Sequence, residues 1–220
     1  YIDLGDTGEW EHFSTHYWKG RSAKPMEDLI PLLNKDVKVV NKGMDLIDKS
    51  LDKIGCLERH FVQGNHEVWL DKFVTRYPYL SHYMTYEALK LNKRGYEYHP
   101  YNRKKLLKIG KLNFTHGKYT SKYHAFKHLD MYGENIMYGH THDLQRHTKT
   151  GAGGTLSGWS LGCLKDIEND EDWLGGKITN WNHAFAIIDW FKGGNFVVNV
   201  VEIIKGQATV WGECIKGSKS

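Results

Sequence analysis

The sequence predicts an α/β protein in which helices pack on β-sheet, and three observations support this class. Strand-like and helix-like segments alternate over the first 140 residues. Between residues 35 and 54, apolar residues recur at three- and four-residue steps, as in a helix with one buried face. After residue 150, apolar and polar residues alternate between glycine pairs, which is typical of antiparallel strands. The length of 220 residues fits a single domain spanning residues 1–220.

The helix predicted over residues 35–54 shows how the elements of the first half are recognised. Lysine and aspartate lie between the apolar residues of this segment, as expected for the exposed face of a helix. Gly55 follows at the position where a glycine in the left-handed conformation ends many helices. Gly43 lies inside the helix, where it costs about 1 kcal/mol relative to alanine and predicts a slight bend. The full prediction places strands at 1–4, 57–63 and 135–138, helices at 35–54, 67–75, 83–92 and 121–131, and a hairpin at 105–115.

The second half is predicted to be mainly β-structure. Glycine is frequent over residues 151–158, which predicts a turn region, and the acidic stretch 165–173 predicts a solvated loop. Three antiparallel strands are expected over residues 184–191, 196–204 and 207–211, with turns at Gly193-Gly194 and Lys205-Gly206.

Composition limits the classes of function. The formal net charge of +4 suits a protein that handles phosphate-bearing substrates, but an ordinary soluble surface has the same balance. The three cysteines are far apart and form no CxxC pair, so they do not indicate structural zinc and favour a reducing, cytoplasmic compartment. No apolar run is long enough to span a membrane, so we expect no membrane partner.

Four short stretches rich in metal-binding side chains stand out, and each follows a predicted strand. We therefore expect them to meet at one edge of the sheet. Their carboxylate, amide oxygen and imidazoles are ligands for hard or borderline divalent metals, and such sites perform hydrolysis. The stretches are Gly5-Asp6, Gly64-Asn65-His66-Glu67, Thr115-His116-Gly117 and Gly139-His140-Thr141-His142.

Each stretch also has a structural interpretation. An aspartate after glycine, such as Asp6, is more often a turn or cap residue than a ligand. An asparagine beside glycine is typical of loops, and Asn65 fits that description. His140 and His142 would point to the same side of an extended backbone, but a surface strand carrying two histidines has the same pattern. The metal-site interpretation depends on the four stretches acting together.

In this order the four stretches resemble the motifs of the calcineurin-like metallophosphoesterase superfamily, and the resemblance covers nearly the whole chain. The segment from Gly158 to the final strands looks like single-domain phage and bacterial members. The resemblance implies a two-sheet αββα sandwich flanked by helices, with a binuclear metal centre at the strand ends. It also implies hydrolysis of a phosphoester substrate by a metal-activated water.

The resemblance implies a role for each motif residue. Asp6 would bridge two divalent ions, while Asn65, His116 and His140 would complete one metal site and His142 would belong to the other. His66 would contact the phosphate and assist the leaving oxygen, with Glu67 supporting it. Glu9 takes the place of the acidic residue in the family's GDxxD pattern. Mn²⁺ is the favoured ion, and iron, Zn²⁺ or Ni²⁺ also fits nitrogen and oxygen ligands.

One motif of the family is missing. Its first strand carries a D-x-H pair that supplies an aspartate and a histidine to the first metal, and no D-x-H occurs in this sequence. We expect that strand to lie upstream of Tyr1, so that the chain is an N-terminally truncated domain. The alternative is a member that has lost one metal.

Other functions stay open at this point. A catalytically degraded relative could use the same scaffold as a binding module. Nuclease action is a further alternative, because Tyr96 to Lys105, with Lys118, Tyr119, Lys122 and Tyr123, combines aromatic and basic residues that could track a nucleic acid. A protein substrate is disfavoured, because Thr7-Gly8-Glu9-Trp10 replaces the VDRG sequence of the Ser/Thr phosphatase branch. His124 and His128, four residues apart, are expected on a helix face, and one of them could instead orient substrate near His116.

Overall fold

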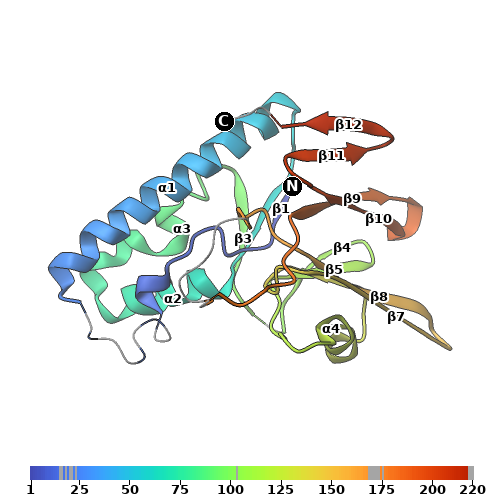
Figure 1. Ribbon diagram of the computed structural model, residues 1–220, viewed down its shortest axis with the longest axis horizontal. Helices are drawn as coiled ribbons and strands as arrows, with labels where there is room; N and C mark the ends of the chain where they lie inside the picture. The colour runs from blue at the N-terminus through green and yellow to red at the C-terminus, as the bar shows by residue number, and fades with distance from the viewer. Residues whose placement is uncertain are drawn as a thin grey trace. The chain divides into compact units, whose positions relative to one another are not determined.

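The computed structural model describes residues 1–217 except 15, 16, 18, 20, 21, 23, 103, 168–173 and 175. Most of the predicted acidic loop, residues 168–173, thus lies outside the described residues. The chain divides into two compact units, Tyr1–Lys105 and Leu106–Ser220. Both contain helices and strands, which confirms the α/β class (Figure 1).

The first unit contains a parallel three-stranded sheet in the order β1-β2-β3. Helices precede and follow β2 in the chain, as expected for parallel strands, which need crossover connections. Its strands are β1 (Ile2–Asp3), β2 (Arg59–Val62) and β3 (Tyr96–His99). Its helices are α1 (Met26–Lys53), α2 (Asn65–Arg76) and α3 (Thr85–Ala88), with 3-10 turns η1 (Glu11–Phe13) and η2 (Pro78–Tyr83).

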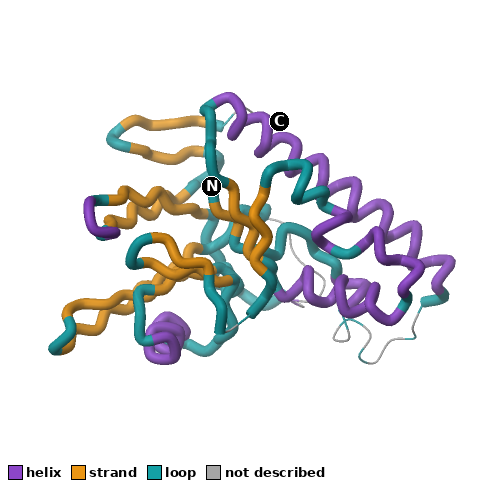
Figure 2. The backbone as a smooth tube through the Cα atoms, turned by 180° about the vertical axis from the view of Figure 1, so that it is seen from behind, coloured by secondary structure: helices purple, strands orange, loops and turns teal. Residues whose placement is uncertain are grey.

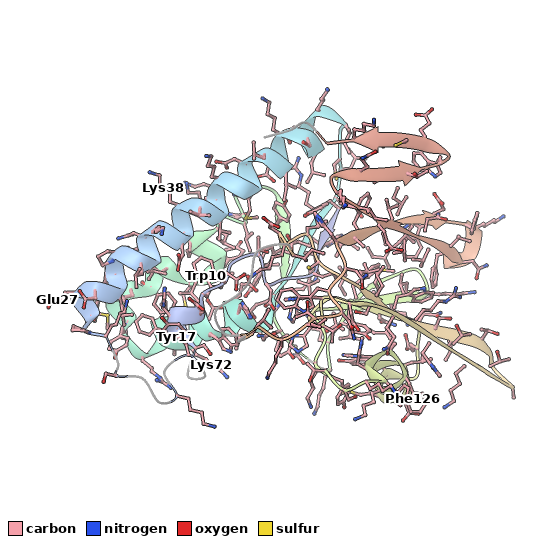
Figure 3. All side chains as sticks on the ribbon, in the orientation of Figure 1. Trp10, Tyr17, Glu27, Lys38, Lys72 and Phe126 are labelled. Carbon is pink, nitrogen blue, oxygen red and sulfur yellow. The ribbon has the colours of Figure 1, made fainter. Side chains whose placement is uncertain are left out.

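The core of the first unit forms where α1 and α2 pack with the sheet. Leu33 from α1, Phe61 from β2 and Leu70 from α2 are fully buried in one apolar cluster. Trp10 from the loop after β1 joins this cluster, and Figure 3 shows it on the inner side of α1, whereas Lys38 points outward. The sequence therefore folds as its apolar stripe predicts, with charged residues on the outer face of α1.

Helix α1 is longer than predicted but ends where predicted. It begins at Met26 and contains Pro31, whose presence hid the first turns from the sequence analysis. Gly55 has a φ of 67°, and the N–H of Cys56 donates to the carbonyl of Leu51 at 2.9 Å, as in a Schellman ending. Among the described residues, α1 and the other helices include none long and apolar enough to cross a membrane.

The second unit contains a mixed five-stranded sheet in the order β4-β5-β6-β8-β7, followed by two hairpins, β9-β10 and β11-β12 (Figure 2). The sheet strands are β4 (Leu107–Ile109), β5 (Leu112–Thr115), β6 (Ile136–Tyr138), β7 (Leu144–Gly151) and β8 (Gly154–Leu161). The hairpin strands are β9 (Ala184–Trp190), β10 (Phe196–Glu202), β11 (Gln207–Val210) and β12 (Glu213–Lys216), with η4 (Lys192–Gly194) between β9 and β10.

Helix α4 (His124–Tyr132) packs on β6, β7 and β8 of this sheet. All residues of β5 and β6 are buried, as expected for the centre of a covered sheet. Strands β5 and β6 run parallel, with Thr115 opposite Tyr138, so their carboxyl ends lie side by side. This register delivers the residues after each strand to the same sheet edge.

Some predictions for secondary structure were wrong in detail, and strands β3 and β7 were not predicted. Residues 151–158 are not a turn region, because β7 and β8 continue to Gly151 and from Gly154 in a long hairpin. The helix predicted over residues 83–92 is only the short helix α3. Pro78, predicted to separate two helices, is the first residue of η2. Strand β12 was missed, although β11 pairs with it along its whole length. The predicted hairpin at Gly110 and the strand pair β9-β10 are confirmed.

Candidate metal centre

In the first unit, Asp6 and the start of α2 meet through two glycines. A Cβ on Gly5 would lie 2.5 Å from the carbonyl oxygen of Val62, and Gly5 also has a φ of +87°. A Cβ on Gly64 would lie 2.2 Å from Oδ1 of Asp6 and 2.4 Å from its backbone nitrogen. Only glycine lets the two loops approach this closely. The Gly-Asp and Gly-Asn pairs of the sequence are therefore two halves of one contact.

Glu67 holds the Asp6 loop in place. Its fully buried carboxylate accepts hydrogen bonds from the backbone N–H groups of Gly64, Asp6 and Thr7, each at 2.9 Å. The N–H of Gly8 and the indole N–H of Trp10 lie at 3.4 Å from the same side chain. The resemblance gives Glu67 the role of supporting His66. In the structure its carboxylate binds the loop that carries Asp6.

Asp6 and His66 lie side by side at the N-terminus of α2. The backbone N–H of His66 donates to Oδ1 of Asp6 at 2.9 Å, and Nε2 of its ring is 3.7 Å from Oδ2. The ring stacks on Trp69 at 4.1 Å, and its Nδ1 is 4.0 Å from a carboxylate oxygen of Glu9. Asn65, the first residue of α2, follows the same turn. A carboxylate here gains from the partial positive charge of the helix start.

In the second unit, His116 and His140 follow the adjacent strands β5 and β6. The N–H of Gly139 donates to the carbonyl of His116 at 3.0 Å, which extends the pairing of the two strands by one step. Nε2 of His116 is then 3.2 Å from Nδ1 of His140. His116 is 1% exposed and His140 is partly buried, so the pair has one ring shielded from solvent and one that solvent reaches.

The spacing of this imidazole pair fits a metal ion. With metal–nitrogen bonds of about 2.0–2.1 Å, neighbouring ligand atoms lie about 3.0 Å apart in an octahedron and about 3.3 Å apart in a tetrahedron. The 3.2 Å between His116 and His140 falls between these values. The residues present therefore suit a divalent ion such as Mn²⁺ or Zn²⁺, for which imidazole is an ordinary ligand.

His142 reaches its position by a different backbone path from the one predicted. We expected an extended backbone, but His140 and His142 have φ values of 69° and 61°, both left-handed. This conformation costs a non-glycine residue roughly 1–2 kcal/mol, which the surrounding fold must offset. The ring of His142 lies edge-on to Trp181 at 4.8 Å, and its carbonyl accepts a hydrogen bond from Asn182 at 2.8 Å.

A buried network supports the segment that contains the last two histidines. Asp143 accepts a hydrogen bond from Nε2 of His124 at 3.0 Å, and Nδ1 of that ring accepts from the hydroxyl of Tyr138 at 2.5 Å. Burial alone would raise the pKa of Asp143, but hydrogen bonds from His124 and Thr141 bring it below its usual value. The residues before and after the Gly139–His142 segment are thus tied to α4.

His128 fixes the loop that follows His116. Its Nε2 accepts hydrogen bonds from the N–H groups of Lys118, at 2.9 Å, and Tyr119, at 3.4 Å, while its Nδ1 donates to the carbonyl of His124 at 2.8 Å. Both ring nitrogens are used in the neutral form. Burial lowers the pKa of His128 to about 4.

His124 and His128 lie on a helix face, as expected from their spacing. Their supporting contacts with the neighbouring loops were not predicted. The available signal was Asp143, directly after His142, because a carboxylate there can orient a neighbouring imidazole. The basic aromatic stretch that suggested nucleic-acid binding is partly structural, since Tyr96 is only 6% exposed and belongs to the core.

Comparisons with known proteins add no family to this description. No protein-family model matches the chain, and a search among curated proteins finds no match. Within the described residues, the fold is that of an α/β protein. Its aspartate and histidine side chains include groups that could hold a metal ion. The chemistry of these side chains is therefore what indicates a function.

Proposed function

We propose that this protein hydrolyses phosphoester bonds with the help of divalent metal ions, as a phosphatase or phosphodiesterase. The observation that carries the proposal is the pair of imidazoles of buried His116 and partly buried His140, with donor nitrogens 3.2 Å apart at the ends of parallel strands. Carboxyl ends of parallel strands are where α/β proteins place their ligands. The resemblance of the four motifs to metallophosphoesterases gives the same chemistry.

The proposal assigns roles by this resemblance. Asp6, Asn65, His116 and His140 would hold one divalent ion, and His142, together with Asp6, would hold the other. The two-sheet sandwich typical of the family belongs to the same proposal. Mn²⁺ is the favoured ion in this proposal, and iron, Zn²⁺ or Ni²⁺ also fits nitrogen and oxygen donors without thiolate.

The protein's own residues prepare the reaction. Glu67 fixes the Asp6 loop. It thereby positions the carboxylate of Asp6, which accepts a hydrogen bond from the backbone N–H of His66. Trp69 holds the His66 ring by stacking, so that the ring can donate a proton to the leaving oxygen of the substrate. Bound divalent ions would supply an activated water and neutralise charge on the phosphoryl group. A phosphoester is proposed over an amide because of the resemblance of the four motifs, since metal-assisted hydrolysis serves both kinds of bond.

The test is hydrolysis of p-nitrophenyl phosphate and bis-p-nitrophenyl phosphate with Mn²⁺ present. His116→Ala and His140→Ala should each lower kcat/KM at least 100-fold, because each removes a metal ligand. His147→Ala is the matched control, since this histidine lies in β7 and packs on Phe126. Equal activity of His116→Ala and His147→Ala would contradict the proposal, and complete inactivity of the unaltered chain would favour a binding module.

A double-mutant cycle tests whether the motifs of the two units serve one centre. Asp6→Asn and His116→Ala are combined, and Mn²⁺ affinity is measured for both single variants and the double variant. Ligands of the same ion should show non-additive losses, with a coupling of about 1 kcal/mol or more. Additive losses would mean that these residues bind different ions or none.

A further inference from the structure

Another group of ligating side chains lies in the first unit, apart from the four motifs. His60 in β2 is directly opposite Glu97 in β3, and His99 follows Glu97 by two residues. Side chains two residues apart on a strand share a face of the sheet, and so do directly paired residues. The register therefore places His60, Glu97 and His99 together on one face of the β2-β3 pair.

The distances within this group are those of ligands around one ion. Nδ1 of His60 is 3.1 Å from Nε2 of His99 and 3.4 Å from a carboxylate oxygen of Glu97. The other carboxylate oxygen of Glu97 is 3.8 Å from Nε2 of His99. Around a zinc ion with bonds of about 2.0–2.1 Å, tetrahedral ligand atoms lie about 3.3 Å apart. The separations of 3.1 Å and 3.4 Å are close to that spacing, and the separation of 3.8 Å is longer.

The outer nitrogen of His60 adds a second, independent observation. Nε2 of His60 is buried and has no hydrogen-bond partner among the residues that the structure describes, although a carboxylate oxygen of Glu58 lies 3.9 Å away. A histidine that binds a metal through Nδ1 carries its proton on Nε2 and usually donates it to a carboxylate. Glu58 is placed to accept that proton after a small movement.

A hydrogen bond between the two imidazoles is the simpler explanation of the 3.1 Å contact. It uses Nδ1 of His60 and Nε2 of His99, one as donor and the other as acceptor. This hydrogen bond does not explain why the carboxylate of Glu97 lies near both imidazole rings. It also leaves the buried Nε2 of His60 without a role. An ion held by all three side chains accounts for these features together.

We propose that His60, Glu97 and His99 form a divalent-cation site of the zinc class, built entirely within the first unit. Two imidazoles and one carboxylate are the protein ligands of many zinc sites, and the fourth position is left to water. The side chains of His60 and His99 are 10% and 18% exposed, while that of Glu97 is 68% exposed, so an ion can enter beside Glu97. This site does not depend on the proposed hydrolase function.

The experiment uses the full chain carrying His116→Ala and His140→Ala, which removes two ligands of the proposed hydrolytic centre. After chelation and dialysis, Zn²⁺ binding is measured by calorimetry, and Co²⁺ is used as a spectroscopic substitute. One Zn²⁺ should bind per chain, and Co²⁺ should give the visible absorption of a four-coordinate ion. Adding Glu97→Gln should weaken binding at least tenfold, and adding His99→Ala should abolish it together with the Co²⁺ band.

Two controls keep the test decisive. His82→Ala, at an exposed histidine of η2, should leave Zn²⁺ binding unchanged. Glu97→Gln alters a mostly exposed side chain, so circular dichroism should show that the variant is folded even if His99→Ala is not. Failure of the His116/His140 background to bind Zn²⁺, or equal binding with and without Glu97→Gln, would overturn the site. Neither result would affect the hydrolysis assay on the unaltered chain.

Discussion

At the scale of single residues, Gly64 decides whether the Asp6 loop can form. A Cβ at this position would lie 2.2 Å from Asp6 Oδ1 and 2.7 Å from Glu67 Oε2. We predict that Gly64→Ala displaces Asp6, lowers Mn²⁺ affinity at least tenfold and destabilises the fold by about 1–3 kcal/mol. Calorimetric titration and urea denaturation measure the two effects.

Gly43 is the matched control for Gly64. It lies inside α1, and a Cβ there would meet nothing within 4 Å. Gly43→Ala should therefore stabilise the protein by about 0.5–1 kcal/mol through better helix propensity. If both alanine variants changed stability in the same direction, the close contact between Gly64 and the Asp6 loop would be refuted.

Glu67 is the second residue on which the loop depends. Replacing it by glutamine puts an NH₂ group among backbone N–H groups that now donate to a carboxylate. We predict a loss of about 2–4 kcal/mol in the free energy of unfolding, because buried charge-assisted hydrogen bonds are lost and donors are left unpaired. Glu213→Gln, at an exposed position of β12, should change it by less than about 0.5 kcal/mol. A similar small loss for both variants would contradict this role.

At the scale of elements, α4 makes stability depend on pH through His128. Its pKa is about 4 in the folded protein, lowered by burial and by the neighbouring His124 and His116, and 6.5 is the ordinary value. The unfolded chain therefore binds more protons between these values, so stability should fall as pH drops from about 6.5 to about 4. The slope from this one residue is at most about 1.4 kcal/mol per pH unit.

The pH effect is measured on metal-free protein by urea denaturation at several pH values. His128→Gln removes the titrating group, so the slope of stability against pH should become flatter. Direct NMR titration of the His128 ring provides a second measurement that does not depend on the variant. A ring that titrates near pH 6.5 in the folded protein would contradict the prediction.

The elements also show which local signals were sufficient. The end of α1 at Gly55 and the turn at Gly110 were predictable, because a glycine with positive φ stops a helix or closes a hairpin by local geometry. The start of α1 was not, since Pro31 usually breaks a helix and is tolerated here in a helix anchored by apolar packing. Hairpin β7-β8 was missed because its glycines indicate turns, while its pairing spans eight residue pairs.

At the scale of the whole molecule, metal binding should stabilise the fold. A ligand that binds only the folded state adds about 2.7 kcal/mol at a concentration 100 times its Kd. We predict that chelation lowers the Tm and that Mn²⁺ restores it. Asp6→Asn and His116→Ala should each remove most of this recovery, while His147→Ala should retain it. A Tm that changes neither on chelation nor on addition of Mn²⁺ would contradict the proposed centre.

The sequence by itself determined the α/β class, the end of α1 and the turn at Gly110, because periodicity and glycine geometry are local properties. Tertiary structure decided what these residues contact. The Glu67 carboxylate accepts hydrogen bonds from a loop about sixty residues earlier in the chain. His60 lies near Glu97 and His99 only because of the β2-β3 register. Such partners depend on which strands pair and in what register, and a linear pattern of residues does not contain that information.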